Sequence, residues 1–371
     1  MKDTFYDVLE TREPAAREAA LMGALPAQVR AAQGTAAFAE LLANVDAAEI
    51  TSRSALAQLP VTRKHELLAR QQAARAAGGD PFGGFSAVGW RAQALAWLAS
   101  RLRKVPLILI IYGIDAWQPT KNRLANWLAD RADWVVSISD ITAQKFRAWA
   151  RAGTQQLMVL PNAIHPEWYG PGVKNPALLK RYRLEGKTVL MTLGRLVSAE
   201  RYKGFDEVID VLPALASVNP NLAYLIVGEG SDRRRLEEKV RALGLADRVV
   251  FAGLVPEVEK ADHYRLADAY IMASRGEGFG FVLLEAMACG VPVIASTLDG
   301  GREAVLDGKL GMLVDPGDAD GLKRAVLDTL QRPTGVVPEG LEHFAFPHFE
   351  ARVHGLIGQV LPEPASPLSS P

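Results

Sequence analysis

The 371-residue chain has one cysteine, no excess charge of either sign and no long apolar run. The single cysteine, Cys289, excludes an intramolecular disulfide, so we expect a protein of a reducing compartment, by default the cytoplasm. Its 42 basic and 42 acidic side chains balance, and without a basic excess we expect no nucleic-acid partner. The longest apolar run covers residues 105–111, far short of the roughly 20 residues of a spanning helix, and the charged N-terminus lacks the apolar core of a signal peptide. The sequence therefore predicts neither a transmembrane segment nor a signal peptide.

The length and the 49% share of hydrophobic residues are sufficient for two domains with separate cores. The first part, residues 1–90, is rich in alanine, arginine, glutamate and glutamine, and it has no alternating or β-branched run. These residue types favour helices. We therefore expect helices and loops there, interrupted by Pro60, Pro81 and the loop sequence GGDPFGG.

From Val105 onward, short β-rich runs alternate with helical periods, which is the pattern of βα units around a parallel sheet. Three predicted strands, PLILIIYG, DWVVSIS and QLMVLPN, precede the sequence NAIHPEWYGPGVKNP, which we interpret as a domain linker. Six more follow it: TVLMTLGR, LAYLIVGEG, RVVFAGLV, DAYIMAS, VPVIAS and GMLVD. Six strands with five intervening helices make a complete doubly wound domain, whereas three strands make only half of one.

The sequence thus predicts an α/β chain of four parts. A helical leader over residues 1–90 is followed by a partial Rossmann-like domain over 91–170 and a complete doubly wound domain over 176–335. Residues 336–371 hold a last helix and a tail that has too little apolar content to pack.

The most informative stretch for function is SRGEGFGFVLLEAMACG, where a predicted strand enters a glycine-rich loop. The helix that begins near Phe281 directs its free N–H groups and positive dipole end at that loop, which suits an anion. Glu285 lies on this otherwise apolar helix, and a buried carboxylate without partners is costly. It could accept hydrogen bonds from ligand hydroxyls, as could Glu277 in the loop; the alternative is an internal ion pair or a favourable contact with the helix dipole.

A second signal is the sequence TLGRLVSAERYKGFDEVI. Arg195 follows the first strand of the second domain and Lys203 precedes its first helix, so both are expected at the carboxyl edge of the sheet, where open α/β folds bind ligands. Cations there would neutralise a diphosphate. The alternative is a solvated charged loop, because Glu200 and Arg201 are also present.

These stretches, with LIVGEGxxRxxLE, VxFAGxV and the E-x7-E pattern of EGFGFVLLEAMACGVPVIAS, resemble the retaining GT-B glycosyltransferases of family 4 over residues 105–355. The resemblance implies a GT-B-like fold and glycosyl transfer with retention, no metal and no cofactor, from a UDP- or GDP-type sugar donor to a glycan or lipid-linked acceptor. Arg195 and Lys203 would bind the donor diphosphate, Glu277 the transferred sugar and Glu285 the ribose. The remaining donor-binding positions would be Gly194, Gly278, Phe279, Gly280 and, near the base, Gly253 and Leu254.

On the acceptor side the resemblance implies Tyr112, Asp115 and Asn162. Tyr112 stands where the family often has a histidine, so the same role does not follow for it. The family's first strand and glycine-rich loop are absent upstream. Residues 1–88 instead resemble the leading helical segment of phenylacetate-CoA-ligase-like adenylate-forming enzymes, and that resemblance ends before any nucleotide-binding loop. Two alternatives therefore stand beside the transferase: a non-catalytic nucleotide-sugar-binding fragment and a sugar-nucleotide epimerase.

Other candidates have structural explanations. The D-x-D sequence of Asp318 and Asp320 opens a predicted helix, where carboxylates complement the dipole. Cys289 is expected in the core, and the histidines have no zinc-like spacing: His65, His165, His263, His343, His348 and His354. The basic helix over residues 90–104, with Trp90, Leu95, Trp97, Leu98 and Leu102, is expected to pack its apolar side on the sheet. Its alternative role is peripheral contact with the inner face of an anionic membrane.

Overall fold

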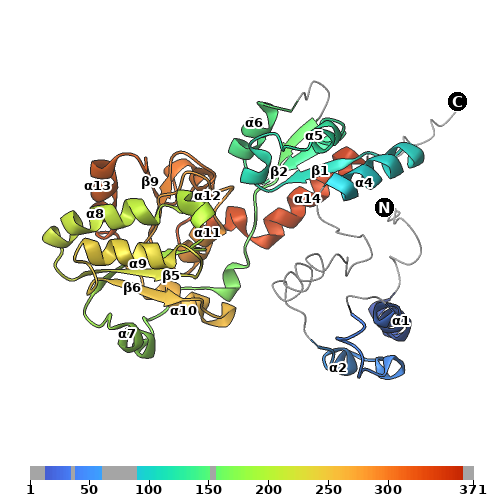
Figure 1. Cartoon of the computed structure of the whole chain (residues 1–371), viewed down its shortest axis with the longest axis horizontal. Helices are drawn as coiled ribbons and strands as arrows, with labels where there is room; N and C mark the ends of the chain where they lie inside the picture. Colours follow the sequence, from blue (N-terminus) through green and yellow to red (C-terminus); the bar gives the residue numbers. More distant parts are fainter. Residues whose placement is uncertain (1–12, 35–37, 61–89, 151–155, 362–371) are drawn as a thin grey trace, which may run out of the picture. The chain divides into compact units, whose positions relative to one another are not determined.

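The computed structural model describes residues 13–34, 38–60, 90–150 and 156–361. The chain divides into two compact units, Met1–Ala92 and Gln93–Pro371 (Figure 1). In the first unit, helix α1 spans Pro14–Gln33, a 3-10 turn η1 spans Ala47–Glu49 and α2 spans Arg53–Leu56. The expected helices are confirmed for residues 13–34 and 38–60, where no strand occurs, and Pro81 and the GGDPFGG loop lie outside the described residues.

The second unit begins with a three-stranded parallel sheet in the order β1-β2-β3. β1 spans Ile108–Ile111, β2 Trp134–Ser137 and β3 Gln156–Val159, and Ile108 pairs with Trp134 in register. Its helices are α4 (Trp90–Arg103), α5 (Arg123–Ala129) and α6 (Asp140–Arg147), with the 3-10 turn η2 at Ile114–Ala116. Among the described residues no strand pairs with the outer edge of β1, so this sheet is half of a doubly wound one.

Helix α4 differs from the expectation. Leu95, Leu98 and Leu102 are 57%, 49% and 74% exposed. In the same helix, the Trp97 ring packs edge-on against the Trp127 ring. The prediction that α4 packs its apolar side on the sheet is therefore wrong for these leucines, because the strands that would lie beyond β1 are absent from the described sheet. No helix in the described residues is both long and apolar enough to cross a membrane.

The larger sheet has six parallel strands in the order β6-β5-β4-β7-β8-β9. Their bounds are β4 Thr188–Leu193, β5 Leu222–Val227, β6 Val249–Gly253, β7 Ala269–Met272, β8 Val293–Ser296 and β9 Met312–Val314. All nine strands of the described residues lie inside the predicted runs. The strand order reverses between β4 and β7, so the crevice at their carboxyl ends is where this type of sheet binds ligands.

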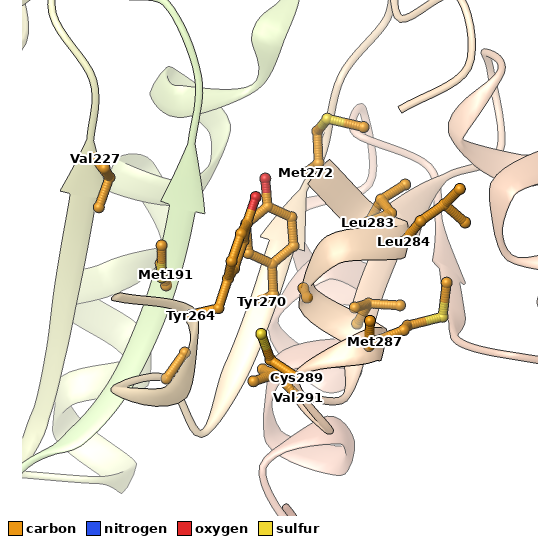
Figure 2. Close-up of a cluster of buried hydrophobic side chains, with 14 of the residues drawn as sticks. Met191, Val227, Tyr264, Tyr270, Met272, Leu283, Leu284, Met287, Cys289 and Val291 are labelled. Carbon is orange, nitrogen blue, oxygen red and sulfur yellow. The ribbon is translucent and has the colours of Figure 1, made fainter. Parts of the chain in front are cut away.

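Helices cover both faces of this sheet and leave two buried apolar layers. They are α7 Pro176–Tyr182, α8 Phe205–Val218, α9 Arg233–Ala242, α10 Lys260–Arg265, α11 Phe281–Ala288, α12 Gly301–Ala304 and α13 Ala319–Thr329, with short 3-10 turns η4 Ser198–Lys203, η5 Glu257–Glu259 and η6 Leu306–Gly308. Figure 2 shows one layer, in which Tyr264 and Tyr270 lie between Met191 of β4 and Leu283 of α11. This buried layer packs against α11, the helix that follows the glycine-rich loop.

The predicted linker and the last helix connect the two sheets. The linker contains the 3-10 turn η3 (Pro166–Trp168), and Ile164 pairs with Ala345 just after η7 (Leu341–Phe344). Helix α14 (Phe346–Val360) then returns to the small sheet, where Leu356 and Val360 bury against Val136. The last helix therefore belongs by its packing to the three-stranded half.

Candidate donor site at the sheet edge

A cavity of about 370 Å³ opens at the carboxyl ends of β4, β5 and β7. Its walls come from the loops that follow these strands, from η4, from the segment between β6 and α10, and from the start of α11. The lining residues are Thr192, Leu193, Gly194, Arg195, Lys203, Phe205, Val227, Gly228, Glu229, Leu254, Val255, Glu257, Lys260, Met272, Glu277, Gly280, Phe281 and Val282. The structure thus brings together Gly194, Arg195, Lys203, Leu254, Glu277 and Gly280, all of which were predicted from the sequence.

Glycines allow the loops after β4 and β5 to touch through their backbones. Gly228 has φ +139°, and a Cβ there would lie 1.9 Å from the carbonyl oxygen of Gly194. The amide of Gly194 donates to the carbonyl of Val227 at 2.9 Å. This side of the cavity is therefore formed by backbone, which can approach a ligand closely.

Lys203 and Glu277 form an ion pair inside the cavity. Lys203 Nζ lies 2.7 Å from Glu277 Oε2, and the two side chains are only 18% and 20% exposed. The next residue, Gly204, is the N-cap of α8 with φ +87°, and a Cβ there would lie 2.2 Å from the carbonyl oxygen of Ala273. The pair offers an ammonium group for an anion and a carboxylate for hydroxyl groups at one point of the wall.

Arg195 lines the same cavity from a more solvated position. Its side chain is 72% exposed and its guanidinium lies 2.6 Å from Glu200, which is 16% exposed. The ion pair with Glu200 fits the solvated-loop interpretation, and the place of Arg195 in the cavity wall fits an anion-binding role. The geometry is compatible with both.

The glycine-rich loop ends in α11, which starts at Phe281 as predicted. Gly280 occupies the N-cap with φ +94°, and no side chain caps the helix, so its first N–H groups are left for another partner. Phe279 is 2% exposed and packs edge-on against Phe344 at 5.5 Å between ring centroids, which anchors the loop. The backbone of residues 278–280 is thereby held at the N-terminus of α11.

Glu285 is satisfied by protein donors. Its Oε1 accepts from Tyr169 at 2.9 Å and from Lys260 at 3.0 Å, and its Oε2 accepts from Tyr264 at 2.6 Å. Burial, with the charge of Glu285, raises the pKa of both tyrosines, so they donate as neutral phenols. The ion pair between Glu285 and Lys260 is the internal ion pair that the sequence analysis named as the alternative to ligand binding. The binding of a ribose by Glu285 stays a prediction.

Sequence reasoning missed the partners of Glu285 and missed Asp299. Tyr169, Lys260 and Tyr264 come from other elements, 116, 25 and 21 residues away from Glu285, so no local pattern marks them. Asp299 is 1% exposed. Burial raises its pKa to about 6, although its hydrogen bonds act in the opposite direction and favour the ionised form. Its position in an Asp-Gly-Gly sequence directly after β8 places it at the same edge of the sheet and was the available signal.

The acceptor-side residues are only partly gathered. A Cβ on Gly113 would lie 3.0 Å from the Cα of Gly278, so the loop after β1 meets the glycine-rich loop. Tyr112 is 70% exposed beside it, and Asp115 is exposed. Asn162 is half-buried in the linker.

The remaining predictions concern the base and the metal. Leu254 is 84% exposed on the cavity wall, and Gly253 accepts a hydrogen bond from the amide of Gly228. Asp318 caps α13 by accepting from the Gly321 amide, and Asp320 pairs with Lys323, which confirms the helix-start interpretation of the D-x-D sequence. The described residues hold no cluster of three metal-ligating side chains. Cys289 is a buried core residue, and burial raises its pKa to about 12.

Residues 177–351 match the protein family described as glycosyl transferases group 1. Among individual proteins, the chain is 35% identical over 238 residues to the GDP-mannose-dependent alpha-(1-6)-phosphatidylinositol monomannoside mannosyltransferase of Mycolicibacterium smegmatis, which covers 62% of this chain and 61% of that protein. It is 43% identical over 198 residues to the phosphatidyl-myo-inositol mannosyltransferase of the same organism, over 53% of this chain and 48% of that one. The chain thus spans no more than about three fifths of these relatives.

Solved structures show the fold. The Anabaena protein HepE in complex with UDP superposes with a TM-score of 0.61 at 23% identity, over 73% of this chain and 77% of that chain. Sucrose-phosphate synthase from Thermosynechococcus elongatus does so with a TM-score of 0.58 at 22% identity, over 82% and 81%. The predicted GT-B-like α/β fold is confirmed. The resemblance of residues 1–88 to adenylate-forming enzymes stays a prediction.

Proposed function

We propose that this chain is a retaining, metal-independent glycosyltransferase that moves a mannosyl group from GDP-mannose to an inositol-containing lipid or glycan. The observation that carries the proposal is the Lys203–Glu277 pair, 2.7 Å apart in a cavity whose wall also holds Arg195 and the start of α11. A nucleotide-diphospho-sugar needs cations for the diphosphate and a carboxylate for the sugar hydroxyls, and this cavity offers both.

The proposed chemistry uses fixed charge. Arg195, Lys203 and the uncapped N–H groups of α11 would stabilise the diphosphate as the bond from the sugar to the phosphate oxygen breaks. The acceptor hydroxyl would form the new bond on the same face of the sugar, next to Glu277, and its proton would pass to the diphosphate oxygen that leaves. Because these groups supply the positive charge that the leaving diphosphate requires, the proposal needs no metal or other cofactor.

Donor and acceptor are proposed from the relatives. Three matched relatives are named for GDP-mannose, and several are named for phosphatidylinositol or inositol phosphate acceptors. The base would lie near Gly253 and Leu254, and the carboxylate of Glu285 would receive a ribose hydroxyl in addition to its protein donors. Tyr112, Asp115 and Asn162 would face the acceptor.

A lipid-linked acceptor suggests a place for α4. The exposed Leu95, Leu98 and Leu102 share this helix with Arg101 and Arg103, a combination that suits an anionic membrane surface. In this proposal the protein works in the cytoplasm, at the inner face of the membrane.

The test is turnover of GDP-mannose with phosphatidylinositol or inositol phosphate as acceptor, compared with UDP-glucose as donor. We expect a mannosylated product from GDP-mannose and none with Glu277→Ala. A sugar isomer released without any acceptor would favour the epimerase, and transfer unchanged in Glu277→Ala and Lys203→Ala would overturn the proposal.

A second candidate is a nucleotide-sugar-binding protein without catalysis. It is favoured by one observation: in the described residues, β1 is an unpaired edge of a three-stranded sheet, with Ile108 and Ile110 38% and 50% exposed. The part of the chain that the structure describes then holds only half of an acceptor domain. This candidate predicts that GDP binds with no turnover of GDP-mannose on any of the acceptors above.

A further inference from the structure

Asp299 is a buried carboxylate with three hydrogen-bond donors around it. Its Oδ2 accepts from the Ser274 hydroxyl at 2.6 Å and from the backbone N–H of Glu277 at 2.8 Å, and its Oδ1 accepts from the Gly301 N–H at 3.0 Å. The side chain is 1% exposed and is not part of the cavity wall. Asp299 therefore contacts the loop that carries Glu277 and does not face the space where a ligand would bind.

The backbone next to Asp299 also binds this loop. The amide of Gly300 donates to the carbonyl of Glu277 at 2.9 Å. A Cβ on Gly300 would lie 2.1 Å from the carbonyl oxygen of Gly278, so only glycine allows this approach. Both backbone polar groups of Glu277 are thus bound to the Asp299–Gly300 segment, which fixes the direction in which its side chain leaves the loop.

The electrostatic surroundings of Asp299 offer little compensation for its charge. Among the described residues it has no ion-pair partner. The negative Glu277 disfavours its ionised form, and Lys145, whose ammonium lies 3.3 Å from the centre of the Trp117 ring, is the cation whose charge acts on it. A buried carboxylate without an ion-pair partner costs stability. The presence of Asp299 at this position therefore indicates a role in holding the loop.

We infer that Asp299 is the positioning residue of the donor site: by accepting from Ser274 and from the Glu277 amide, it holds Glu277 against Lys203 in the geometry that sugar transfer requires. The inference deepens the proposed function and rests on it. Asp299 touches neither the donor nor the acceptor, and it acts through Glu277.

Asp299→Asn tests the inference, because asparagine keeps the size of the side chain but turns one acceptor into a donor that faces existing donors. We expect kcat for GDP-mannose to fall about 100-fold, the scale of a misplaced catalytic group, while the KM changes little. Asp268→Asn is the matched control, since Asp268 also accepts a backbone N–H, from Val189 at 2.7 Å, but at the opposite end of β7. An unchanged kcat in Asp299→Asn, or an equal fall in Asp268→Asn, would overturn the inference.

A second measurement is independent of activity. Hydrogen exchange of the Glu277 amide should become about tenfold faster in Asp299→Asn, because the bond to a buried carboxylate protects it. If the wild-type chain binds neither GDP nor UDP, the proposed function fails, and the exchange result still decides whether Asp299 holds the loop. Should Asp299→Asn not fold, Ser274→Ala removes one donor, keeps the Glu277 bond and is expected to lower kcat by less; no change in kcat would then count against the inference.

Discussion

The carboxylate of Glu303 on α12 accepts a hydrogen bond from the backbone N–H of Asp140 at 2.6 Å, in the first turn of α6. Its second oxygen accepts from the Ile141 N–H at 2.9 Å. A side chain of the six-stranded domain therefore satisfies two orphan amides of a helix in the three-stranded half, across 163 residues of sequence. The contact lies four residues beyond Asp299, so one short segment attaches to both the donor loop and the other half of the fold.

Replacing Glu303 by alanine should weaken this attachment. Loss of the two bonds at the start of α6 is expected to lower the free energy of unfolding by about 1 kcal/mol, as for other helix caps. Chemical denaturation measures that loss, and faster hydrogen exchange at Asp140 and Ile141 locates it. Glu342→Ala is the control, since Glu342 accepts from the Gly340 amide in its own turn; the same loss in both variants would contradict a link between the two halves.

Glu277→Ala should separate binding from chemistry. The carboxylate is expected to contact the sugar and not the diphosphate, so GDP affinity should stay within about threefold, while turnover of GDP-mannose should fall at least about 100-fold. Calorimetry with GDP and a product assay on the same preparation give the two numbers. A variant that lost GDP affinity in proportion to turnover would assign Glu277 to the nucleotide.

Protonation of Asp299 at low pH should raise the stability of the fold and lower the activity. Its pKa of about 6 lies above the ordinary 3.8, so protonation favours the folded state. The stability that this group contributes is complete below pH 3.8 and is lost as the pH rises through 6. Activity should do the reverse and fall as the pH drops below 6, because a protonated Asp299 no longer accepts from all three donors.

The pH profile of kcat and the unfolding free energy between pH 4 and 8 check this together. The charges of Glu277 and Lys145 also act on Asp299, so Asp299→Asn serves as the reference. Its kcat profile should lose the step near pH 6. A wild-type enzyme with no acid fall in kcat, or a variant that retains the same step, would contradict the assignment.

Helix α4 should determine any binding to membranes. Replacing Leu95, Leu98 and Leu102 together by serine removes apolar surface that is already exposed, so the fold should be little affected. Co-sedimentation with vesicles of phosphatidylglycerol and phosphatidylcholine should show binding of the wild-type chain and none of the variant. Wild-type protein that stays in the supernatant would exclude α4 as a membrane contact.

The strands could be predicted because parallel strands covered on both faces are apolar along their whole length, as in LAYLIV of β5, where every residue is buried. The start of α11 followed from glycines before an apolar run. The exposure of Leu95, Leu98 and Leu102 could not be predicted from periodicity, because it depends on what lies beyond β1.

The site was accessible only in part. Arg195, Lys203 and Glu277 follow or precede strands and helices at one edge, and the rule that parallel strands end together places them side by side. The cage around Glu285 could not be foreseen, since Tyr169 comes from the linker and reaches the carboxylate only through the tertiary fold. Asp299 was missed because it binds the backbone of a loop, and a contact with backbone requires no particular residue type at a fixed distance along the sequence.

The central claim is a nucleotide site built around Lys203, and calorimetric titration of the full chain with GDP and with UDP tests it most directly. We predict that GDP binds and that Lys203→Ala weakens the binding about 10- to 100-fold, as expected for loss of a charge-assisted hydrogen bond. Lys323→Ala, which removes a half-buried lysine that pairs with Asp320 on α13, should bind as the wild type does. The account would be contradicted if neither nucleotide bound, or if Lys203→Ala bound GDP as tightly as the unaltered chain.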